Sequence, residues 1–486
     1  MSSGIDDAVA VSGAHRPGMN TMSGSTTIQS VILAAGLGTR MRSETIKVLH
    51  DILGKPMIEH VVEAALDSGS SKVISVLGHQ RERVEDCLRE RDYADQLDFA
   101  VQSEQQGTAH AVWAARDAID RDIDYTAILC GDVPNMDGAA LSQFFEATVD
   151  SGADVGLVTA IVDDPAQYGR IVRGDSGRVE AIVEYADATD EQRAIDEINA
   201  GIYLVRTSML MDALAQIMGD EPDNAQGEYY LTDLIEYGAR EGGVFGWAVD
   251  NPEMIQGVNN RADLAAATDF ARRRINHGWM LDGVTFVDPD NTVVEPGVEL
   301  ARDTTLYPGV VLQGDTTIDS GTVVESGCVV KDCQIGADVH LKANSYLTEA
   351  RVDDGSNIGP SAHLRPGADI GKDCKVGNFV EVKKARLDDG AKAGHLTYLG
   401  DAHIGPGANI GAGTITCNYD GKKKSKTTIG AGAFIGSNAS LVAPVNIGER
   451  AYVGAGSVIT DDVDDRCLGV ARGRQRIIEN WVPNEE

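Results

Sequence analysis

Residues 294–330 read VEPGVELARDTTLYPGVVLQGDTTIDSGTVVESGCVV, and an aliphatic residue returns at every sixth position of this stretch. An α-helix repeats every 3.6 residues and a half-buried strand every two, so neither sustains a period of six. A six-residue period is typical of a β-helix, in which each rung places one aliphatic side chain inside a prism and turns at small residues. The stretch therefore predicts a parallel β-helix of hexapeptide repeats. Its aliphatic series is Val294, Leu300, Leu306, Leu312, Ile318, Val324 and Val330.

The same spacing continues further along the chain, with breaks in register between runs. Chance spacing of aliphatic residues does not explain three such runs in one chain. The composition fits the same fold, because 54 glycines and only 5% aromatic residues suit many tight turns around a narrow core. We expect the β-helix to span residues 284–486. The later positions are Ile358, Leu364, Ile370, Val376 and Val382, then Ile404 and Ile410, then Ile429, Ile435, Leu441, Ile447, Val453 and Ile459.

The half that precedes the β-helix alternates strand-like and helix-like segments. Such alternation predicts an α/β domain with a mainly parallel sheet, helices on both faces and ligands at the carboxyl ends of the strands. We assign this domain to residues 29–258 and a helical linker to residues 259–283, where residues 261–276 form an amphipathic pattern. The strand-like runs are SVILAAGLGTRM (30–41), KVISVLG (72–78), YTAILCGDVP (125–134) and DVGLVTAIV (154–162), and the helical segments are Met57–Asp67, Glu82–Arg91, Ala109–Ala118 and Gly138–Asp150.

The charge balance of the 486-residue chain is strongly acidic, with 42 Lys+Arg against 75 Asp+Glu and a net charge of −33. Nucleic acids and anionic membranes are bound by clusters of Lys and Arg, so neither is an expected partner. No apolar run approaches the roughly 18 to 20 residues that span a bilayer. Residues 1–28 are polar and lack the apolar core of a signal peptide, so we expect a flexible tail. Seven cysteines without C-x-x-C spacing favour reduced thiols and a cytoplasmic protein.

A glycine-rich segment, LAAGLGTRM (33–41), follows the first strand-like run. Backbone N–H groups of such a segment can bind phosphates. Arg40 and Lys47 lie close by in sequence, and two cations beside a phosphate loop would offset the charge of a triphosphate. The alternative is that both are ordinary solvated surface cations.

Further polar residues lie at the ends of later strand-like runs. Gln102, Gly107 and Thr108 combine an amide with a Gly-Thr turn, a set suited to the edge of a base. Asp132 directly follows a strand, where a carboxylate could hold Mg²⁺; an Asp in that position is more often only a turn residue or helix cap. The remaining candidates in this half are Gly169, Glu184, Asn199 and Asn259.

These motifs, taken in order, resemble the sugar-1-phosphate nucleotidyltransferases: LAAGLGTRM with Lys47, QGTAHA, GD, YGRI, IVE, N-x-GIY and GVNNR. Together with the hexapeptide half, the chain resembles the bifunctional bacterial family that joins a UDP-N-acetylglucosamine pyrophosphorylase to a glucosamine-1-phosphate N-acetyltransferase. The resemblance covers residues 29–476. It implies a Rossmann-like nucleotidyltransferase domain followed by a left-handed parallel β-helix.

The resemblance also implies roles for the first half. Uridyl transfer from UTP would use Mg²⁺ held by Asp132 and Asn259. Two departures from the family pattern are Leu37, in place of a common Lys, and Cys130, in place of a common Tyr. The residues implied to bind UTP or UDP-N-acetylglucosamine are Leu33, Ala34, Ala35, Gly36, Arg40, Lys47, Gln102, Gly107, Thr108, Gly169, Glu184, Asn199 and Asn259.

The stretch 364–427 is more polar than a β-helix rung requires. A lone His on a rung is as often a surface residue as a functional one, but histidine is the residue type best suited to act as a general base near neutral pH. By resemblance, His395 activates the amino group of glucosamine-1-phosphate to attack acetyl-CoA. The implied glucosamine-1-phosphate ligands are Arg365, Lys383, Tyr398 and Asn409, and the implied acetyl-CoA ligands are Ala412, Asn418, Tyr419, Ser437, Ala455 and Arg472.

Four lysines form the one dense basic run of the sequence: Lys422, Lys423, Lys424 and Lys426. One interpretation is a solvated loop. The other is that these side chains attract the phosphates of coenzyme A.

The resemblance implies small-molecule substrates, a homotrimer built through the β-helix, and a role in supplying UDP-N-acetylglucosamine for peptidoglycan and other envelope polymers. A competing hypothesis is a single-activity nucleotidyltransferase whose β-helix only oligomerises. The set of His395, Lys383, Arg365 and Tyr398 argues against it, as does Ala35, where those enzymes usually carry a second Gly. A second competitor is a non-catalytic scaffold with degenerate sites, which would require the positions of Asp132, Lys47 and His395 to be eroded, and all three are intact.

Overall fold

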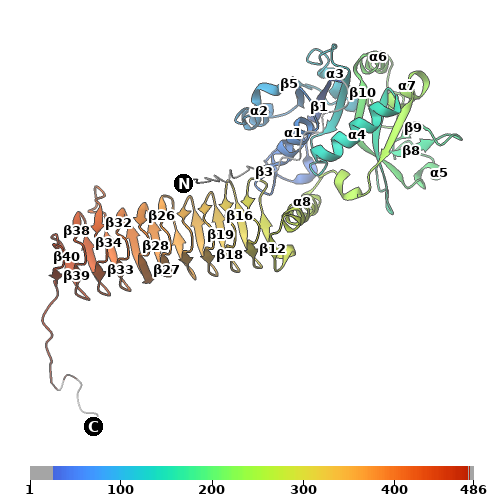
Figure 1. The fold of residues 1–486 in the computed structure, drawn as a ribbon. Coiled ribbons are helices and arrows are strands. Elements are labelled where there is room, and N and C mark those ends of the chain that lie inside the picture. Colours follow the sequence, from blue (N-terminus) through green and yellow to red (C-terminus); the bar gives the residue numbers. More distant parts are fainter. Residues whose placement is uncertain (1–25, 480, 482–486) are drawn as a thin grey trace, which may run out of the picture. The chain divides into compact units, whose positions relative to one another are not determined.

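The computed structural model describes residues 26–479 and 481, so most of the expected tail over residues 1–28 lies outside the described residues. The chain forms two compact units, one that ends at Ala271 and one that begins at Arg272. Figure 1 identifies the elements of both units.

The N-terminal unit contains a nine-stranded sheet in the order β11-β7-β10-β6-β1-β4-β5, to which β8 and β9 attach through β10. Strand β1 lies inside the sheet and pairs in parallel with β4 and β6. Its strands are β1 (Ile28–Ala34), β4 (Val73–Leu77), β5 (Leu97–Val101), β6 (Tyr125–Cys130), β7 (Val155–Ile161), β8 (Arg170–Arg173), β9 (Val179–Val183), β10 (Glu197–Arg206) and β11 (Val244–Ala248), with a separate small hairpin of β2 (Asp51–Ile52) and β3 (Lys55–Pro56).

The expectation of a mainly parallel sheet holds for β5, β4, β1 and β6 and for the β11–β7 pair. Strand β10 departs from it, because it runs antiparallel to both β6 and β7. The chain between β7 and β10 forms the antiparallel β8–β9 hairpin and one short helix. For β10 to run parallel to β7, the chain would have to cross back to the end of the sheet at which β7 begins, and the segment between the two strands makes no such crossover.

Helices cover both faces of the sheet, as predicted. Successive residues of a strand point to opposite faces, so Val31 belongs to one apolar core and Ile32 to the other. The helices of this unit are α1 (Met57–Asp67), α2 (Arg81–Arg89), α3 (Thr108–Ala114), α4 (Gly138–Ser151), α5 (Asp190–Arg193), α6 (Thr207–Ile217) and α7 (Asp233–Glu241), with short 3₁₀ turns η1 (Thr39–Met41), η2 (Lys47–Leu49), η3 (Ala94–Gln96) and η4 (Pro252–Ile255). Helix α8 (Arg261–Leu281) begins in this unit and ends in the next, which also contains the 3₁₀ turn η5 (Pro289–Asn291).

Helix α8 contains the amphipathic segment predicted over residues 261–276. Its first turn is capped from both sides, since Asn260 Oδ1 accepts from the backbone N–H groups of Ala262 and Asp263 while Asp263 Oδ2 accepts from that of Asn259. The cap therefore fixes the backbone at Asn259, one of the candidate site residues.

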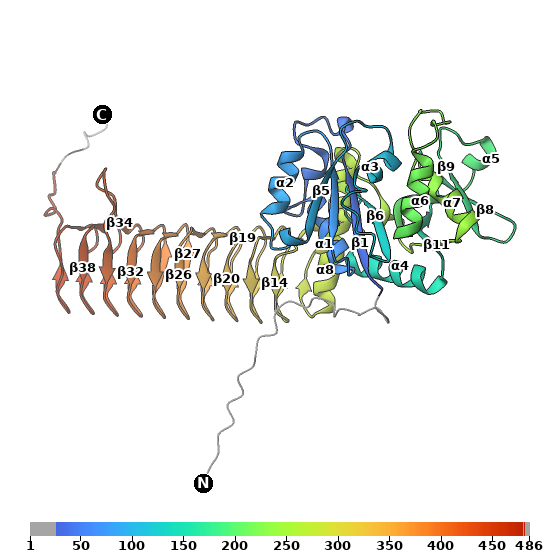
Figure 2. The ribbon, with the colours of Figure 1, turned by 90° about the horizontal axis from the view of Figure 1, so that it is seen from above.

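The C-terminal unit is a three-sided parallel β-helix (Figures 1 and 2). Each strand pairs with the strand three places further on, except that β39 pairs with β41, so three parallel sheets form the sides of a prism. The first prism sheet holds β12 (Thr285–Phe286), β15 (Thr305–Leu306), β18 (Val323–Val324), β21 (His340–Leu341), β24 (Asn357–Ile358), β27 (Lys375–Asn378), β30 (Lys392–His395), β33 (Asn409–Ile410), β36 (Phe434–Ile435), β39 (Tyr452–Val453) and β41 (Leu468–Gly469).

The other two sides are built in the same way from short strands. The second prism sheet holds β13 (Val293–Val294), β16 (Val311–Gln313), β19 (Val329–Lys331), β22 (Tyr346–Thr348), β25 (His363–Leu364), β28 (Glu381–Lys383), β31 (Tyr398–Gly400), β34 (Ile415–Cys417), β37 (Ser440–Val442) and β40 (Val458–Ile459). The third prism sheet holds β14 (Glu299–Leu300), β17 (Thr317–Ile318), β20 (Gln334–Ile335), β23 (Arg351–Val352), β26 (Ala368–Ile370), β29 (Ala385–Leu387), β32 (Ala402–Ile404), β35 (Thr427–Ile429) and β38 (Val445–Ile447).

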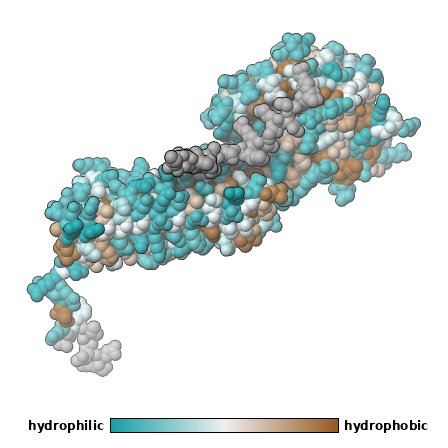
Figure 3. Space-filling view, viewed as in Figure 1, coloured by the Kyte–Doolittle hydropathy of each residue, from teal (hydrophilic) through white to brown (hydrophobic). Residues whose placement is uncertain are grey.

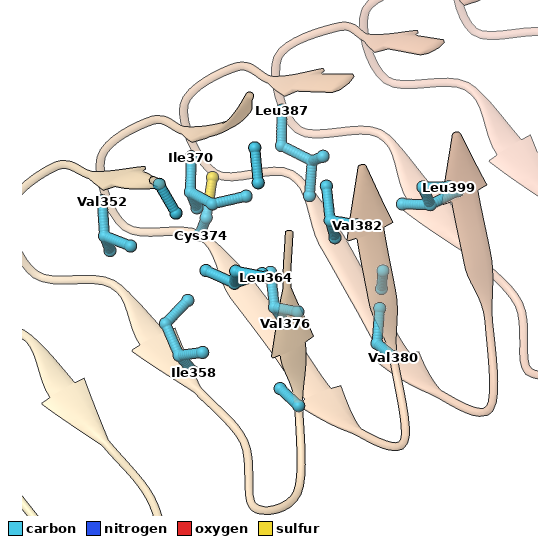
Figure 4. Packing of buried hydrophobic residues seen from close by; sticks show 14 of the residues in the cluster. Val352, Ile358, Leu364, Ile370, Cys374, Val376, Val380, Val382, Leu387 and Leu399 are labelled. Carbon is cyan, nitrogen blue, oxygen red and sulfur yellow. The ribbon is translucent and has the colours of Figure 1, made fainter. Parts of the chain in front are cut away.

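Every aliphatic position of the predicted series lies in the core of the prism. Figure 4 shows Ile358, Leu364, Ile370, Val376 and Val382 inside it, and none of the five is exposed to solvent. Burying one such side chain contributes about 1.5–3 kcal/mol. Each six-residue repeat therefore forms one side of the prism and contributes one side chain to its core.

The breaks before Ile358 and before Ile404 come from shorter corners between the second and third prism sheets, whereas the break before Ile429 comes from the longer segment between β34 and β35. Four of these corners turn one residue early, each through a residue with positive φ: Asp332 (52°), Glu349 (45°), Lys384 (46°) and Asp401 (46°). A left-handed residue allows a tighter turn. The chain thus keeps its rungs aligned while the sequence period slips from six to five.

The seven cysteines form no disulfide bond. Cys328, Cys333 and Cys374 are buried in the prism, where burial raises the pKa of the Cys328 and Cys333 thiols to about 11. No helix in residues 26–479 combines the length and apolarity needed to span a bilayer. The surface seen in Figure 3 is mostly hydrophilic, in keeping with the excess of acidic residues.

Candidate active sites

The glycine-rich loop of the N-terminal unit follows β1 and leads into the turn η1. Gly38 has a φ of 60°, and a Cβ at this position would lie 2.6 Å from Lys47 Cβ. Glycine therefore lets the Lys47 side chain pass directly against the loop. The loop is fixed from its other side, because Gln105 Nε2 donates to the Ala35 carbonyl oxygen at 2.7 Å. Gln105 was not among the predicted site residues.

Four predicted residues converge at the carboxyl end of β6. Lys47 Nζ forms an ion pair with Asp132 and also donates to Asn259 Oδ1 at 3.1 Å. Arg40 donates to the same Asn259 oxygen at 2.8 Å. The backbone N–H of Val258 donates to the Asp132 carbonyl oxygen, which holds the segment with Asn259 against the end of β6.

The oxygens of Asp132 and Asn259 meet the donor requirements of Mg²⁺. A carboxylate and an amide oxygen are hard ligands, and Mg²⁺ usually takes one or two protein oxygens and completes its shell with water and substrate phosphates. Both oxygens contact the same cation, the Lys47 ammonium, so they converge on a common position. The residue set fits the predicted metal.

A second group lies beyond β5, at the start of α3. Gln102 is 6% exposed, and its Nε2 lies 3.1 Å from both the Gly107 carbonyl oxygen and His110 Nδ1. Thr108 Oγ1 accepts from the backbone N–H of Leu231. Gly107 has a φ of 115°, and a Cβ there would lie 2.4 Å from the Tyr229 carbonyl oxygen, so the turn requires glycine. The amide nitrogen of Gln102 is occupied, which leaves its Oε1 to accept from a ligand.

A third group brings together Gly169, Glu184 and Asn199. The backbone N–H of Asn199 donates to the Gly169 carbonyl oxygen at 2.9 Å, and a Cβ on Gly169 would lie 3.4 Å from Glu184 Oε1. Burial, together with the negative charge of Asp187, raises the pKa of the Glu184 carboxyl. Asn199 Nδ2 donates to the Tyr203 hydroxyl at 2.7 Å, and both side chains are buried.

Tyr203 is a residue that the sequence analysis missed. It lies four positions after Asn199 on β10, within the N-x-GIY motif, so the two side chains point to the same side of the strand, and the β-bulge between them shortens the distance that separates them. Cys130, the departure from the family pattern, contacts the same region, since its Sγ donates to the Gly201 carbonyl oxygen at 3.3 Å. Burial raises the pKa of the Cys130 thiol to about 12, so the thiol stays protonated.

In the C-terminal unit, His395 ends β30 on the first prism sheet. Its Nδ1 lies 2.5 Å from Asn378 Oδ1, and Asn378 ends β27, the strand paired with β30. An amide oxygen only accepts, so Nδ1 carries the proton and Nε2 is left as the basic nitrogen. Asn378 was not among the predicted site residues. The sequence feature that could have identified it is its position 17 residues before His395, which is one coil earlier in the β-helix.

Small residues occupy the position equivalent to His395 on the three coils that follow. Ala412, Ser437 and Ala455 each lie two residues after the core residue of β33, β36 and β39, as His395 does on β30. Arg472 Nη1 donates to the Ala455 carbonyl oxygen at 2.8 Å. Successive coils of a parallel stack are about 4.8 Å apart, so His395, Ala412, Ser437 and Ala455 form a row about 14 Å long, here called the track.

The predicted sugar-phosphate ligands lie around this corner. Arg365 follows β25, Lys383 ends β28 and Tyr398 begins β31, all on the second prism sheet, whereas Asn409 faces outward on the first. Arg365 forms an ion pair with Glu381 at 2.6 Å.

Two predicted acetyl-CoA ligands lie apart from the track. Asn418 and Tyr419 belong to the corner between the second and third prism sheets, where Asn418 Nδ2 donates to Asp401. One copy of the chain therefore does not bring all the predicted acetyl-transfer residues together.

Comparisons with known proteins match both units. Residues 29–248 match the nucleotidyl transferase family, and residues 426–461 match the bacterial transferase hexapeptide family. The bifunctional protein GlmU of Shouchella clausii is 43% identical and aligns with 94% of this chain and 99% of its own length. The bifunctional protein GlmU of Trichlorobacter lovleyi is 46% identical, over 93% of this chain and 97% of its own length. The chain belongs to the bifunctional GlmU family.

This membership confirms the resemblance drawn from the motifs and the predicted fold class. Because the GlmU relatives align over nearly their whole length, the likeness includes both units and is not limited to the nucleotidyltransferase half. The nucleotidyl transferase match also establishes nucleotides as substrates.

Proposed function

We propose that the two units catalyse successive steps in the synthesis of UDP-N-acetylglucosamine. As a member of the GlmU family, the chain acetylates glucosamine-1-phosphate and transfers UMP from UTP to N-acetylglucosamine-1-phosphate, with release of pyrophosphate. The convergence of Arg40, Lys47, Asp132 and Asn259 at the end of β6 is the observation that carries the assignment of the second step. We divide the chain into a uridyltransferase domain over residues 29–258, a linker over 259–283 and an acetyltransferase domain over 284–486.

Uridyl transfer requires positioning and charge neutralisation more than a protein nucleophile. The sugar phosphate attacks the α-phosphorus of UTP in line, a P–O bond forms, and pyrophosphate leaves. Arg40 and Lys47 neutralise the phosphates, and the backbone from Leu33 to Gly36 binds the nucleotide. Mg²⁺, held by Asp132 and Asn259, supplies further charge neutralisation when bound. Gln102 Oε1, whose amide nitrogen is occupied, accepts from uracil N3–H, with Gly107 and Thr108 beside it.

The sugar of N-acetylglucosamine-1-phosphate binds at Gly169, Glu184 and Asn199. The absence of a side chain at Gly169 leaves space against Glu184, whose carboxylate accepts hydrogen bonds from sugar hydroxyls. Asn199 offers the second hydrogen atom of its Nδ2, since the first is donated to Tyr203.

Acetyl transfer uses His395 as the general base. Nε2 takes a proton from the amino group of glucosamine-1-phosphate as the amino nitrogen bonds to the thioester carbon. The C–S bond then breaks, and the proton passes from Nε2 to the leaving sulfur, which releases coenzyme A and restores the base. Arg365 and Lys383 bind the sugar phosphate, while Tyr398 and Asn409 position the sugar. The track of Ala412, Ser437 and Ala455 leaves room for the extended arm of acetyl-CoA, and backbone N–H groups along it stabilise the oxyanion.

We also propose that the acetyl-transfer site is completed in a homotrimer. The exposed large apolar side chains of the β-helix gather on the first two prism sheets and the corner between them, whereas the third sheet faces outward with polar and charged residues. Packing one prism against the next through these sheets would bring Asn418 and Tyr419 of one copy toward the His395 corner of another. Tyr419, at the corner between the second and third sheets, is an exception. The exposed residues on the first two sheets and their shared corner are Val287, Tyr307, Tyr346, Phe379, Leu396, Ile415, Phe434, Tyr452, Val458, Leu468 and Val470.

A two-step assay tests the assignment. Given glucosamine-1-phosphate, acetyl-CoA, UTP and Mg²⁺, the purified chain should release both coenzyme A and pyrophosphate. With glucosamine-1-phosphate as substrate for the first step, His395→Ala should abolish release of coenzyme A. With N-acetylglucosamine-1-phosphate supplied directly, Asp132→Ala should abolish release of pyrophosphate. If either folded variant loses both steps under these conditions, the two-site assignment is wrong. Because UTP and acetyl-CoA are cytoplasmic metabolites, we place the reaction in the cytoplasm.

A further inference from the structure

Gln102, the residue that follows β5, is held by hydrogen bonds at its backbone and at its side chain. Its backbone N–H donates to the carbonyl oxygen of Leu77, the last residue of β4, at 2.9 Å. Its side-chain Nε2 lies 3.1 Å from two atoms at the start of α3, the Gly107 carbonyl oxygen and His110 Nδ1. Gln102 is 6% exposed, so water offers its amide few alternative partners. The orientation of the amide is therefore set by two residues of one helix start.

The Gly107 carbonyl decides which end of the Gln102 amide faces α3. Gly107 is the N-cap of this helix, and its carbonyl oxygen already accepts from the backbone N–H of Ala111 at 3.2 Å. A carbonyl oxygen only accepts, so the amide must turn its nitrogen, and not its oxygen, toward this position. The first N–H of Gln102 Nε2 is consequently directed to the helix cap.

His110 takes the second N–H of the same amide nitrogen. Its Nδ1 faces Nε2 of Gln102, and a ring nitrogen that accepts from an N–H carries no proton of its own, so the ring proton is on the other nitrogen of His110. The ring is half-buried and lies in the first turn of α3, which fixes its position relative to the Gly107 cap. An amide nitrogen has only two hydrogen atoms. With both of them donated to α3, Gln102 presents only an acceptor, Oε1, to a ligand.

An acceptor in this position distinguishes two pyrimidine bases. Ring position 3 carries a hydrogen atom in uracil, whereas in cytosine the same nitrogen is an acceptor and is repelled by Oε1. To donate to cytosine, the Gln102 amide would have to turn over, so that its nitrogen and oxygen exchange places. This rotation would break the hydrogen bonds to Gly107 and His110 and bring Oε1 against the Gly107 carbonyl oxygen. Leaving such buried polar groups unpaired is the means by which a polar site rejects a wrong ligand.

We propose that His110 is a positioning residue that makes the nucleotide site select uracil over cytosine. The proposal rests on the proposed function, in which Gln102 Oε1 accepts from uracil N3–H. His110 acts through Gln102 and not on the base, because its Nδ1 adds a second hydrogen bond to the cost of turning the amide over. Without this acceptor, only the Gly107 carbonyl would hold the amide in the orientation that suits uracil.

Two substitutions at His110 separate hydrogen-bond acceptance from packing. His110→Asn keeps an acceptor near the place of Nδ1 but loses volume, whereas His110→Leu keeps the volume but loses the acceptor. The full chain is assayed with N-acetylglucosamine-1-phosphate and Mg²⁺ for the KM of UTP and for the inhibition constant of CTP as its competitor. The matched control is His60→Leu, since His60 is also half-buried and hydrogen-bonded, through Nε2 at 2.9 Å from the Ile52 carbonyl oxygen, and lies on α1.

We expect His110→Leu to lower the ratio of the CTP inhibition constant to the UTP KM by about tenfold, the upper range for one hydrogen bond, and His110→Asn to lower it by less than about twofold. His60→Leu should leave the ratio unchanged. A packing role predicts the opposite order of the two His110 variants. If His110→Leu leaves the ratio unchanged, or if His110→Asn lowers it as much as His110→Leu, the proposal is overturned.

Gln102→Ala distinguishes failure of this proposal from failure of the proposed function. It should lower the same ratio, and adding His110→Leu to it should cause no further decrease, because coupled residues do not contribute independently. If Gln102→Ala lowers the ratio and His110→Leu does not, only the positioning role of His110 fails. If Gln102→Ala changes neither the ratio nor the KM of UTP, the assignment of Gln102 to uracil fails, and the role of His110 fails with it. A parent chain that releases no pyrophosphate contradicts the proposed function itself.

Discussion

The two units gather polar residues in different ways. At the end of β6, residues 40, 47, 132 and 259 meet within hydrogen-bond distance inside one chain. In the β-helix, the candidate residues recur at matching positions of successive coils and occupy more than one face, so that Asn418 and Tyr419 lie apart from the His395 corner. An open sheet collects distant segments at one edge, whereas a prism distributes them along its length. We therefore expect the first site to be complete in one copy and the second to require another.

The largest effect is expected from a substitution that prevents copies of the chain from packing together, because only the proposed acetyl-transfer site depends on that packing. Phe434→Asp places a charge in the exposed apolar column of the first prism sheet and should prevent packing of copies. We expect acetyl transfer to fall by about a hundredfold or more, comparable to the loss of an interface hot spot, while uridyl transfer is retained. Sedimentation and the two assays measure the outcome. Thr428→Asp, at an outward position of the third sheet, is the matched control and should leave both the assembly and the activities unchanged.

A smaller effect is expected where a partner orients the general base. Asn378→Ala removes the acceptor for His395 Nδ1–H, so the ring loses its fixed tautomer. Loss of a group that orients a metal-ligating histidine costs about 10–100-fold, and we expect a similar cost for a group that orients a general base. We expect a decrease of this size in kcat for acetyl transfer, with an altered pH profile and an unchanged rate of uridyl transfer. A purely structural role for Asn378 would leave the pH profile unchanged.

In the N-terminal unit, Tyr203→Phe should raise the KM for N-acetylglucosamine-1-phosphate. The change removes the acceptor of Asn199 Nδ2, and one hydrogen bond contributes about 0.5–1.5 kcal/mol, or up to about tenfold. The KM for UTP should not change. Tyr125→Phe is a suitable control, because Tyr125 is also buried and its hydroxyl accepts from Arg206 at 3.0 Å.

Tyr203 acts through Asn199 in this interpretation, so the double variant Asn199→Ala/Tyr203→Phe should bind the sugar no worse than Asn199→Ala alone. Additive losses would contradict this coupling. No effect of Asn199→Ala itself would remove Asn199 from the proposed sugar site.

The smallest effect concerns the buried carboxyl of Glu184. Burial raises its pKa in the folded chain, so its contribution to stability is greatest at low pH and is lost as the pH rises through the folded pKa. Glu184→Gln should therefore raise the melting temperature relative to the parent at pH 8, with a smaller difference at pH 5. It should also weaken sugar binding. Glu82→Gln, at an exposed position, should show no such pH-dependent difference.

The sequence alone was sufficient to predict the prism, because the hexapeptide series reports its buried positions one by one. The register slips were visible, but not their cause, since a left-handed Asp332 or Lys384 leaves no distinct sequence pattern. The antiparallel direction of β10 was missed for a similar reason: residue alternation is the same in both directions of a strand. Asn378 and Tyr203 were missed because each acts on a partner, His395 or Asn199, whose contact depends on coil alignment or on a bulge.

The segment 418–426 leaves and rejoins the prism without interrupting it, since β32 pairs directly with β35 across the added length. Coil stacking depends on neighbouring rungs, and the entropy cost of closing a longer loop grows only slowly with its length. Insertions and substitutions in this segment are therefore tolerated far better than changes in the rungs. The four lysines of this segment, which form the densest group of positive charges in the chain, can therefore change during evolution at little cost to folding.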